Sequence, residues 1–144
     1  MSETADLPDL NVWLALAWDG HLHHQQALAY WEQQAAQRVL FCTVTALGLV
    51  RLLSQPKLMG SGVRSVLEAS VLFQAFCQQP GVGLAGTDHQ AWDVFHALLT
   101  QTALPPKHCT DAYLAALAMA NGWRLVTFDR DFRRFAGLDW LGLA

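Results

Sequence analysis

Three aspartates stand beside long apolar stretches of the sequence. Asp9 lies within Leu-Pro-Asp-Leu-Asn-Val-Trp, Asp111 precedes Ala-Tyr-Leu-Ala-Ala-Leu-Ala, and Asp129 directly follows Leu-Val-Thr-Phe. An ionised carboxylate in apolar surroundings is unfavourable unless it is paired, hydrogen-bonded or bound to a cation. Asp131, two residues after Asp129, is an additional candidate. These four side chains are therefore the first candidates for chemistry.

Each of these aspartates also has a purely structural explanation. Asp9 and Asp129 could each cap a helix that begins just past a strand. Asp111 could compensate the positive end of a helix dipole, and Asp131 could pair with a nearby arginine. The chemical hypothesis therefore depends on whether the four positions meet in space.

The order of predicted elements brings these positions to one edge of a sheet. Strands are predicted near residues 7–9, 39–44, 82–85 and 123–128, with helices near 21–37, 45–53, 63–78, 88–102 and 110–120. Strands that alternate with helices indicate an α/β fold, in which a mostly parallel central sheet is flanked by helices in three layers. Ligands of such sheets bind beyond the carboxyl ends of the strands. Asp9 and Asp129 follow strands, and Asp111 begins a helix on the same sheet.

Carboxylates gathered at one edge of a sheet favour a bound cation. Like charges raise one another's pKa unless a cation lies between them. Oxygen ligands alone select hard ions, Mg²⁺ or Mn²⁺, which keep bound waters. Such an ion can activate a water and stabilise the leaving oxygen in phosphodiester hydrolysis. We therefore expect Mg²⁺ or Mn²⁺ as the cofactor of these aspartates.

Composition limits the class of protein. The 144 residues fit a single domain, residues 1–144. Only 15% of them are charged, against about 25% in a typical soluble domain, so we expect a partner to cover part of the apolar surface. The net charge of −3 lacks the strongly basic signature of nucleic-acid binding. Basic residues cluster near the C-terminus, however, and Arg130 and Arg133 are candidates to contact substrate phosphates, with a solvated helix face as the alternative.

The cysteines and the hydropathy pattern indicate the compartment. The three cysteines are widely spaced, which argues against a disulfide framework or a structural zinc site and favours the cytoplasm. The acidic N-terminus is unlike a signal peptide, and we expect no membrane span, because no stretch of about 18 uncharged apolar residues occurs.

PIN domains carry three acidic motifs, and three segments of this chain resemble them: Pro-Asp-Leu-Asn-Val-Trp-Leu-Ala-Leu, Thr-Asp-Ala-Tyr-Leu-Ala-Ala-Leu-Ala and Leu-Val-Thr-Phe-Asp-Arg-Asp-Phe. The whole chain is similar to VapC-type toxins of bacterial toxin–antitoxin pairs, in motif order and in spacing. The resemblance implies a Mg²⁺- or Mn²⁺-dependent endoribonuclease that cleaves structured RNA such as tRNA or ribosomal RNA. It also implies a homodimer and neutralisation by a VapB-like antitoxin.

The resemblance assigns roles to individual residues. Asp9 and Asp111 match the family's metal-binding aspartates, and Asp129 matches the acid after the last central strand. Asn11 and Thr110 match polar positions that flank the site. These residues, with Asp131 as a further metal ligand, form the predicted catalytic and metal-binding set.

One position departs from the family pattern. The family's second acid is usually a Glu on the helix after the second strand, and Gly48 stands at that position. The missing carboxylate predicts weak binding of one metal ion. It also keeps open an alternative, in which the chain is a degenerate, non-catalytic PIN-like interaction module. An aspartyl-phosphate phosphatase is less consistent with the sequence, because Asn11 stands where its second Asp would be.

Other residues invite chemical roles that we do not assign. His21, His23 and His24 lack a matching distant ligand set for a metal. His108 and Cys109 precede Thr110 and could line a cleft, but no Cys–His–Asn order supports nucleophilic catalysis. For Trp13, Trp31 and Trp92, core packing is favoured over base stacking, because they occur at core spacing in helices.

Overall fold

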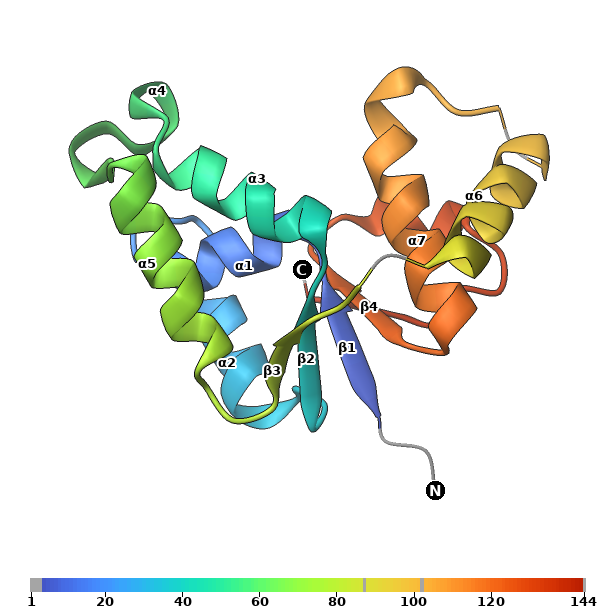
Figure 1. Ribbon diagram of the computed structural model, residues 1–144, viewed down its shortest axis with the longest axis horizontal. Helices are drawn as coiled ribbons and strands as arrows, with labels where there is room; N and C mark the ends of the chain where they lie inside the picture. The colour runs from blue at the N-terminus through green and yellow to red at the C-terminus, as the bar shows by residue number, and fades with distance from the viewer. Residues whose placement is uncertain (1–3, 87, 102, 144) are drawn as a thin grey trace.

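The computed structural model describes residues 4–86, 88–101 and 103–143. Its centre is a parallel sheet with the strand order β3-β2-β1-β4-β5 (Figure 1). The strands are β1 (Ala5–Pro8), β2 (Arg38–Phe41), β3 (Val82–Leu84), β4 (Arg124–Thr127) and β5 (Trp140–Gly142). All neighbouring strands in this order pair in parallel, which confirms the predicted α/β class.

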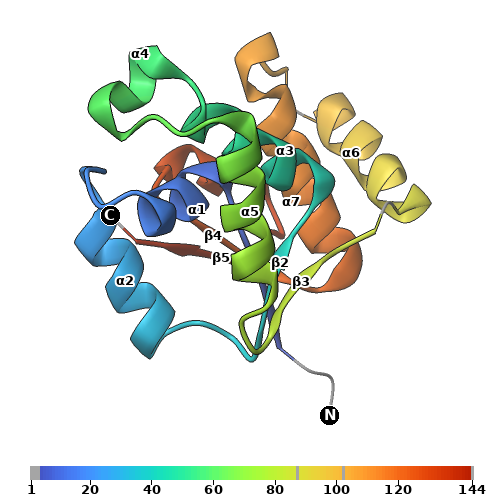
Figure 2. The same ribbon diagram turned by 60° about the vertical axis from the view of Figure 1, so that its left-hand side comes forward.

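Helices cover both faces of the sheet. The α-helices are α1 (Leu10–Ala17), α2 (His24–Gln33), α3 (Thr43–Leu53), α4 (Pro56–Met59), α5 (Val66–Cys77), α6 (His89–Gln101) and α7 (Cys109–Asn121). Short 3₁₀ segments are η1 (Gly60–Gly62), η2 (Pro106–His108) and η3 (Arg130–Arg134). Figure 2 shows α2 and α5 in front of the sheet and α6 and α7 beyond it, which is the predicted three-layer arrangement.

Apolar clusters on both faces of the sheet hold these layers together. On one face, Leu7 and Leu125 of the sheet pack with the alanine- and leucine-rich side of α7, including Leu117. On the other face, Trp13 of α1 stacks on Phe41 of β2, with ring centroids 3.7 Å apart. The central strands are thus buried on both sides, as their continuous apolar sequences require in a parallel sheet.

Several predicted boundaries were wrong. The first strand begins at Ala5, so that Asp6 is inside it, and α7 begins at Cys109, one residue before the predicted start. The strand β5 and the short helices α4 and η1 were not predicted. The predicted end of one helix at residue 102 lies outside the described residues. No helix among the described residues is long and apolar enough to cross a membrane.

Candidate active site

Asp9 lies at the junction between β1 and α1. Its backbone N–H donates to the carbonyl of Val126 at 2.9 Å, which holds it beside β4. Its side chain caps α1 by accepting a hydrogen bond from the Val12 N–H at 3.2 Å. The structural interpretation of Asp9 as a helix cap is therefore correct, but it uses only one of the two carboxylate oxygens.

Thr127, the last residue of β4, engages the other oxygen. Its buried hydroxyl donates to Asp9 Oδ2 and accepts a hydrogen bond from the Asp129 backbone N–H at 2.9 Å. One hydroxyl therefore joins the carboxyl ends of β1 and β4 and orients two of the predicted acids. The sequence motifs do not indicate Thr127, although a hydroxyl in an apolar central strand requires a hydrogen-bond partner.

Asp111 approaches from the first turn of α7. Its Oδ2 lies 3.3 Å from Nδ1 of His108, the residue that precedes this helix. Burial raises the pKa of Asp111 and the Asp129 charge raises it further, whereas His108 and Arg134 lower it. Asp111 thus faces both the acids of the site and a histidine that the sequence did not assign to it.

The carboxylates influence one another electrostatically. Burial is the main reason that the pKa of Asp9 rises from 3.8 to about 6, and the Asp111 charge adds to the effect. The hydrogen bonds from Thr127 and Val12 oppose this rise. Only 6% of Asp9 is exposed, and within the described part of the chain no Lys, Arg or His lies within 4 Å of its carboxylate. A bound divalent cation would remove both the repulsion and the unfavourable burial of charge.

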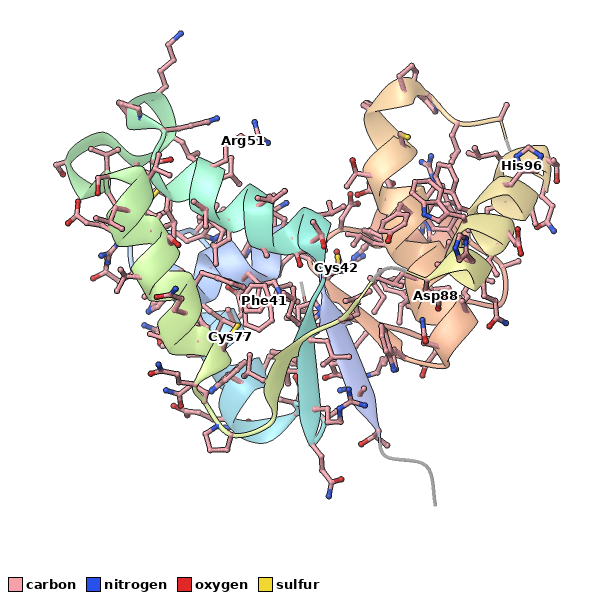
Figure 3. The ribbon with its side chains drawn as sticks, in the orientation of Figure 1. Phe41, Cys42, Arg51, Cys77, Asp88 and His96 are labelled. Atoms are coloured by element: carbon pink, nitrogen blue, oxygen red, sulfur yellow. The ribbon has the colours of Figure 1, made fainter. Side chains whose placement is uncertain are left out.

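One cleft of about 310 Å³ brings several predicted residues together. It is lined by Asp9, Leu10, Asn11, Val44, Thr45, Gly48, Arg51, Thr110, Asp111 and Leu114. Figure 3 shows its walls, α3 on one side and α7 on the other, with Cys42 between them at the start of α3. Asp9, Asp111, Asn11 and Thr110, predicted from distant parts of the sequence, therefore share one surface.

Asp129 and Asp131 do not line this cleft. Asp129 begins η3 and accepts a hydrogen bond from the Asp131 N–H at 2.8 Å, so it is a cap as well as a neighbour of Asp111. The Asp131 carboxylate lies 3.9 Å from Arg134 and is mostly exposed. Arg130 and Arg133 are also outside the lining of the cleft.

The donors in the cleft fit a hard cation that is held by few protein ligands. In the residues that the structure describes, no three Asp, Glu, His or Cys side chains are grouped closely enough to hold a metal ion by themselves. Two carboxylates and nearby oxygen donors nevertheless suit Mg²⁺, which commonly binds one or two carboxylates and keeps its remaining waters for substrate phosphates. Asp9 and Asp111 are the residues that would hold it.

Gly48, which is expected to stand where the family usually has a Glu, lines the same cleft. A Cβ atom on Gly48 would lie 2.6 Å from Leu10 Cδ2. The Leu10 side chain thus occupies the space into which a side chain at position 48 would point. A Glu at this position would first have to displace the flexible end of Leu10, a steric conflict that the sequence could not reveal.

Other residues have simpler explanations. His24 Nδ1 lies 2.6 Å from the Ala15 carbonyl, and the His23 ring stacks on Phe128 with centroids 4.5 Å apart. Trp13 is fully buried, as predicted. The core prediction was wrong for Trp92, whose side chain lies beside Tyr113 but is 52% exposed, because it occupies an outer position of α6.

Comparison with known proteins gives consistent matches. A family model described as PIN domain matches residues 7–138. Ribonuclease VapC41 of Mycobacterium tuberculosis is 35% identical over 138 residues, which cover 92% of this chain and 94% of the relative.

Solved structures also share the fold, and two of them illustrate this. The Mycobacterium tuberculosis VapC20, described as a Sarcin-Ricin loop cleaving toxin, has a TM-score of 0.70, 19% identity and coverage of 92% of this chain and 95% of its own. VapBC2 from Rickettsia felis, bound to a DNA fragment from its promoter, has a TM-score of 0.71, 13% identity and coverage of 98% and 100%.

Proposed function

Since this chain belongs to the PIN-domain family, we propose that it is a VapC-like toxin, an endoribonuclease that hydrolyses structured RNA such as tRNA or ribosomal RNA with Mg²⁺ or Mn²⁺. One observation carries the proposal: the buried Asp9 and the helix-borne Asp111 meet in a single cleft at the carboxyl edge of a parallel sheet. The ribonuclease name of VapC41 and the RNA-cleaving description of VapC20 support it.

The residues of the site have separate proposed roles. Asp9 and Asp111 would hold the cation, Asp129, which lies outside the lining of the cleft, would act through water, and Asp131 is a less direct candidate. When bound, the ion supplies an activated water and stabilises the leaving oxygen of the phosphodiester. Thr127 keeps Asp9 in place, as His108 does for Asp111. Asn11 and Thr110 offer hydrogen bonds to the substrate, and Arg130 and Arg133 remain candidates for phosphates farther along the RNA.

The direct test is cleavage of purified tRNA and ribosomal RNA by the chain, with Mn²⁺ or Mg²⁺ and with EDTA. We expect discrete fragments that require the metal and that are absent with the Asp9→Asn variant. Asp93→Asn, which removes an exposed carboxylate on α6, is the matched control and should cleave like the parent. Cleavage that persists in EDTA would contradict the metal dependence, and intact RNA in every reaction would contradict the proposal as a whole.

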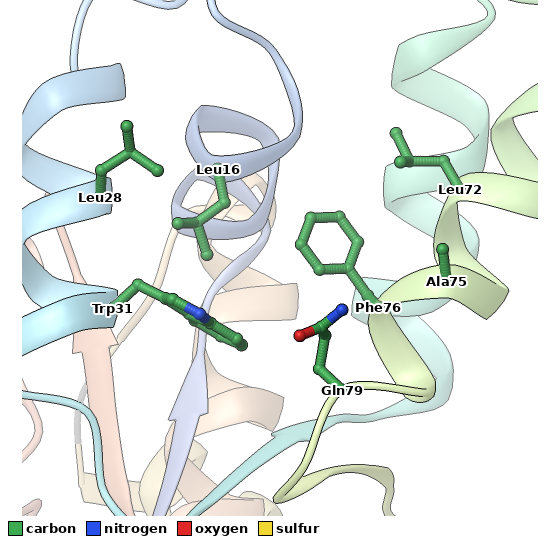
Figure 4. A pocket seen from close by; sticks show the side chains of 7 residues that line it. All are labelled: Leu16, Leu28, Trp31, Leu72, Ala75, Phe76 and Gln79. Atoms are coloured by element: carbon green, nitrogen blue, oxygen red, sulfur yellow. The ribbon is translucent and has the colours of Figure 1, made fainter.

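The proposed partner is a VapB-like antitoxin. The solved structures that share this fold include VapBC complexes from Rickettsia felis. An apolar groove of about 240 Å³ lies between α1, α2 and α5, where Leu16, Trp31 and Phe76 face a common space (Figure 4). It offers an apolar surface to an antitoxin segment. Expression in a bacterial cytoplasm should arrest growth, co-expression of the cognate antitoxin should restore it, and Leu72→Asp in the groove should weaken the rescue.

A homodimer is the proposed state of the toxin. Trp92 and Leu99, both on α6, are 52% and 39% exposed, which is unusual for large apolar side chains and favours contact with a second copy. Light scattering should give twice the chain mass, and a Trp92→Lys, Leu99→Lys double variant should reduce it to the mass of one chain. A monomeric parent protein would contradict the dimer without affecting the nuclease proposal.

One observation favours a second candidate, a non-catalytic interaction module. Leu10 fills the space beside Gly48, so the cleft is apolar where the family usually has an acid. RNA that binds to the chain and remains intact with Mn²⁺ at neutral pH would favour this module over the ribonuclease.

A further inference from the structure

We propose that Arg51 binds a substrate phosphate beside the candidate active site, so that the RNA strand passes from the aspartates along α3. The inference rests on the proposed ribonuclease function and adds the direction of the substrate and a residue that recognises it. The sequence does not indicate Arg51, because a single arginine in the last turn of an apolar helix has no distinguishing pattern.

The shape of the surface supports this path. The cleft that contains Asp9 adjoins a second hollow of about 460 Å³ over α3. The two hollows share Val44, Gly48 and Arg51 in their linings, so they form one continuous groove. Figure 3 shows the Arg51 side chain projecting outward from α3. A strand whose scissile phosphate lies at the aspartates would therefore pass Arg51 as it enters the second hollow.

The Arg51 side chain carries a charge that no described carboxylate neutralises. Among the described residues, no carboxylate lies within 4 Å of its guanidinium, whereas Arg124 pairs with Asp6 and Arg134 pairs with Asp131. An exposed arginine in the last turn of a helix could simply favour the helix dipole. Arg51, however, is the one cationic residue in the lining of a cleft whose other charged residues are Asp9 and Asp111. Its guanidinium can donate two parallel hydrogen bonds to a phosphate.

Gly48 explains why this arginine is available. It lies three residues before Arg51 on α3, a spacing at which helical side chains are neighbours. Gly48 brings no acidic side chain that could pair with Arg51, and the apolar end of Leu10 fills the space beside it. The Arg51 guanidinium therefore remains available for an anionic substrate. Glycine at this position removes one potential metal ligand and leaves Arg51 for a phosphate contact.

The experiment measures binding of bulk tRNA to the non-cleaving Asp9→Asn chain, with and without Arg51→Gln, across a series of salt concentrations. We expect Arg51→Gln to weaken binding about fivefold and to reduce the slope of log K against log salt by roughly 0.7 to 0.9, the loss of one phosphate contact. In the chain that retains Asp9, Arg51→Gln should raise KM more than it lowers kcat. Arg51→Lys should retain the slope and lose part of the affinity. Arg64→Gln, which removes an exposed arginine outside both hollows, is the matched control.

Calorimetry with Mn²⁺ alone separates this role from a structural one. Arg51→Gln should bind Mn²⁺ like the parent, and an altered affinity would overturn the phosphate assignment. Equal tRNA affinity and salt slope for Arg51→Gln, in a chain whose parent cleaves RNA, would overturn this inference alone. So would an equal loss in Arg64→Gln. A parent that neither binds nor cleaves RNA would overturn the proposed function and this inference with it.

Discussion

Two buried aspartates lie three residues apart, at opposite ends of the strand β1, and their surroundings differ. Both oxygens of Asp6 accept hydrogen bonds from Arg124 at 2.9 Å, and Oδ2 also accepts from the Tyr30 hydroxyl and the Ala36 N–H. Asp9, by contrast, accepts hydrogen bonds from the Thr127 hydroxyl and from backbone N–H groups at the start of α1, and no described Lys, Arg or His lies within 4 Å of its carboxylate. Burial therefore raises the pKa of Asp9.

The difference is between a carboxylate whose charge is compensated within the protein, Asp6, and one whose charge is not, Asp9. A buried acid that is paired and fully hydrogen-bonded joins segments of the fold, and its charge is already compensated. A buried acid without a countercharge keeps an affinity for cations, and its charge is compensated only when a cation binds. Both residues occur in the apolar beginning of the sequence, so their types alone do not distinguish them.

The largest expected effect is on catalysis, when Asp9 at the carboxyl end of β1 is changed. Asp9→Asn preserves volume and removes the charge of the proposed metal ligand. We expect cleavage to fall by roughly 1,000-fold, which corresponds to several kcal/mol of metal-dependent stabilisation. Initial rates on tRNA with saturating Mn²⁺ measure it, with Asp93→Asn as the control. A fall of less than about tenfold would place the essential acid elsewhere.

The next largest effect is on the free energy of unfolding, when Asp6 near the start of β1 is changed. Asp6→Asn leaves the Arg124 guanidinium without its countercharge and weakens the contact to Tyr30. Breaking a buried pair in this way costs about 3 kcal/mol, at the lower end of the usual range because Arg124 is partly exposed. Urea denaturation measures the loss. Cleavage per folded molecule should be unchanged, and a selective loss of activity would contradict the contrast between the two ends.

The pH dependence of stability distinguishes the two ends further. Without metal, folded Asp9 has a pKa of about 6, raised from 3.8, so between these values the folded state binds more protons than the unfolded state. Stability should therefore fall as pH rises through this window, by about 3 kcal/mol, and the full penalty should be present above pH 6. Asp9→Asn should lack this contribution and be the more stable chain at pH 7 in EDTA. Parallel stability curves for the two chains between pH 4 and 7 would show that Asp9 ionises without penalty.

The smallest effect tests how the second acid of the cleft is positioned. His108→Ala removes the contact with Asp111 and should weaken Mn²⁺ binding about tenfold, as expected for loss of a group that orients a metal ligand. His108→Gln should recover part of the affinity, because an amide can still donate a hydrogen bond. His96→Ala, on the exposed side of α6, provides the comparison in calorimetry. An unchanged affinity in His108→Ala would mean that Asp111 is oriented by the helix alone.

Local patterns were sufficient for most of the architecture. Apolar strand segments alternate with amphipathic helices, and this periodicity follows from neighbouring residues without knowledge of the fold. It placed Asp9 and Asp129 after strands and Asp111 at a helix start. It missed β5, because the three residues Trp140–Gly142 are too short to show alternation and form a strand only by pairing with β4. It also placed the start of α7 one residue late, since η2 after Pro105 leads directly into that helix.

The sequence by itself determined the class of fold and indicated the two acids that the folded chain brings into one cleft, because apolar periodicity and motif spacing are properties of the local chain. Only the tertiary structure decided what those acids contact. The hydrogen bonds between Thr127 and Asp9, and between Arg124 and Asp6, each join residues 118 positions apart. The packing of Leu10 against Gly48 likewise depends on how α1 crosses α3. Such contacts follow from strand order and helix packing. Whether the charge of Asp6 or of Asp9 is compensated is therefore decided only when the chain is folded.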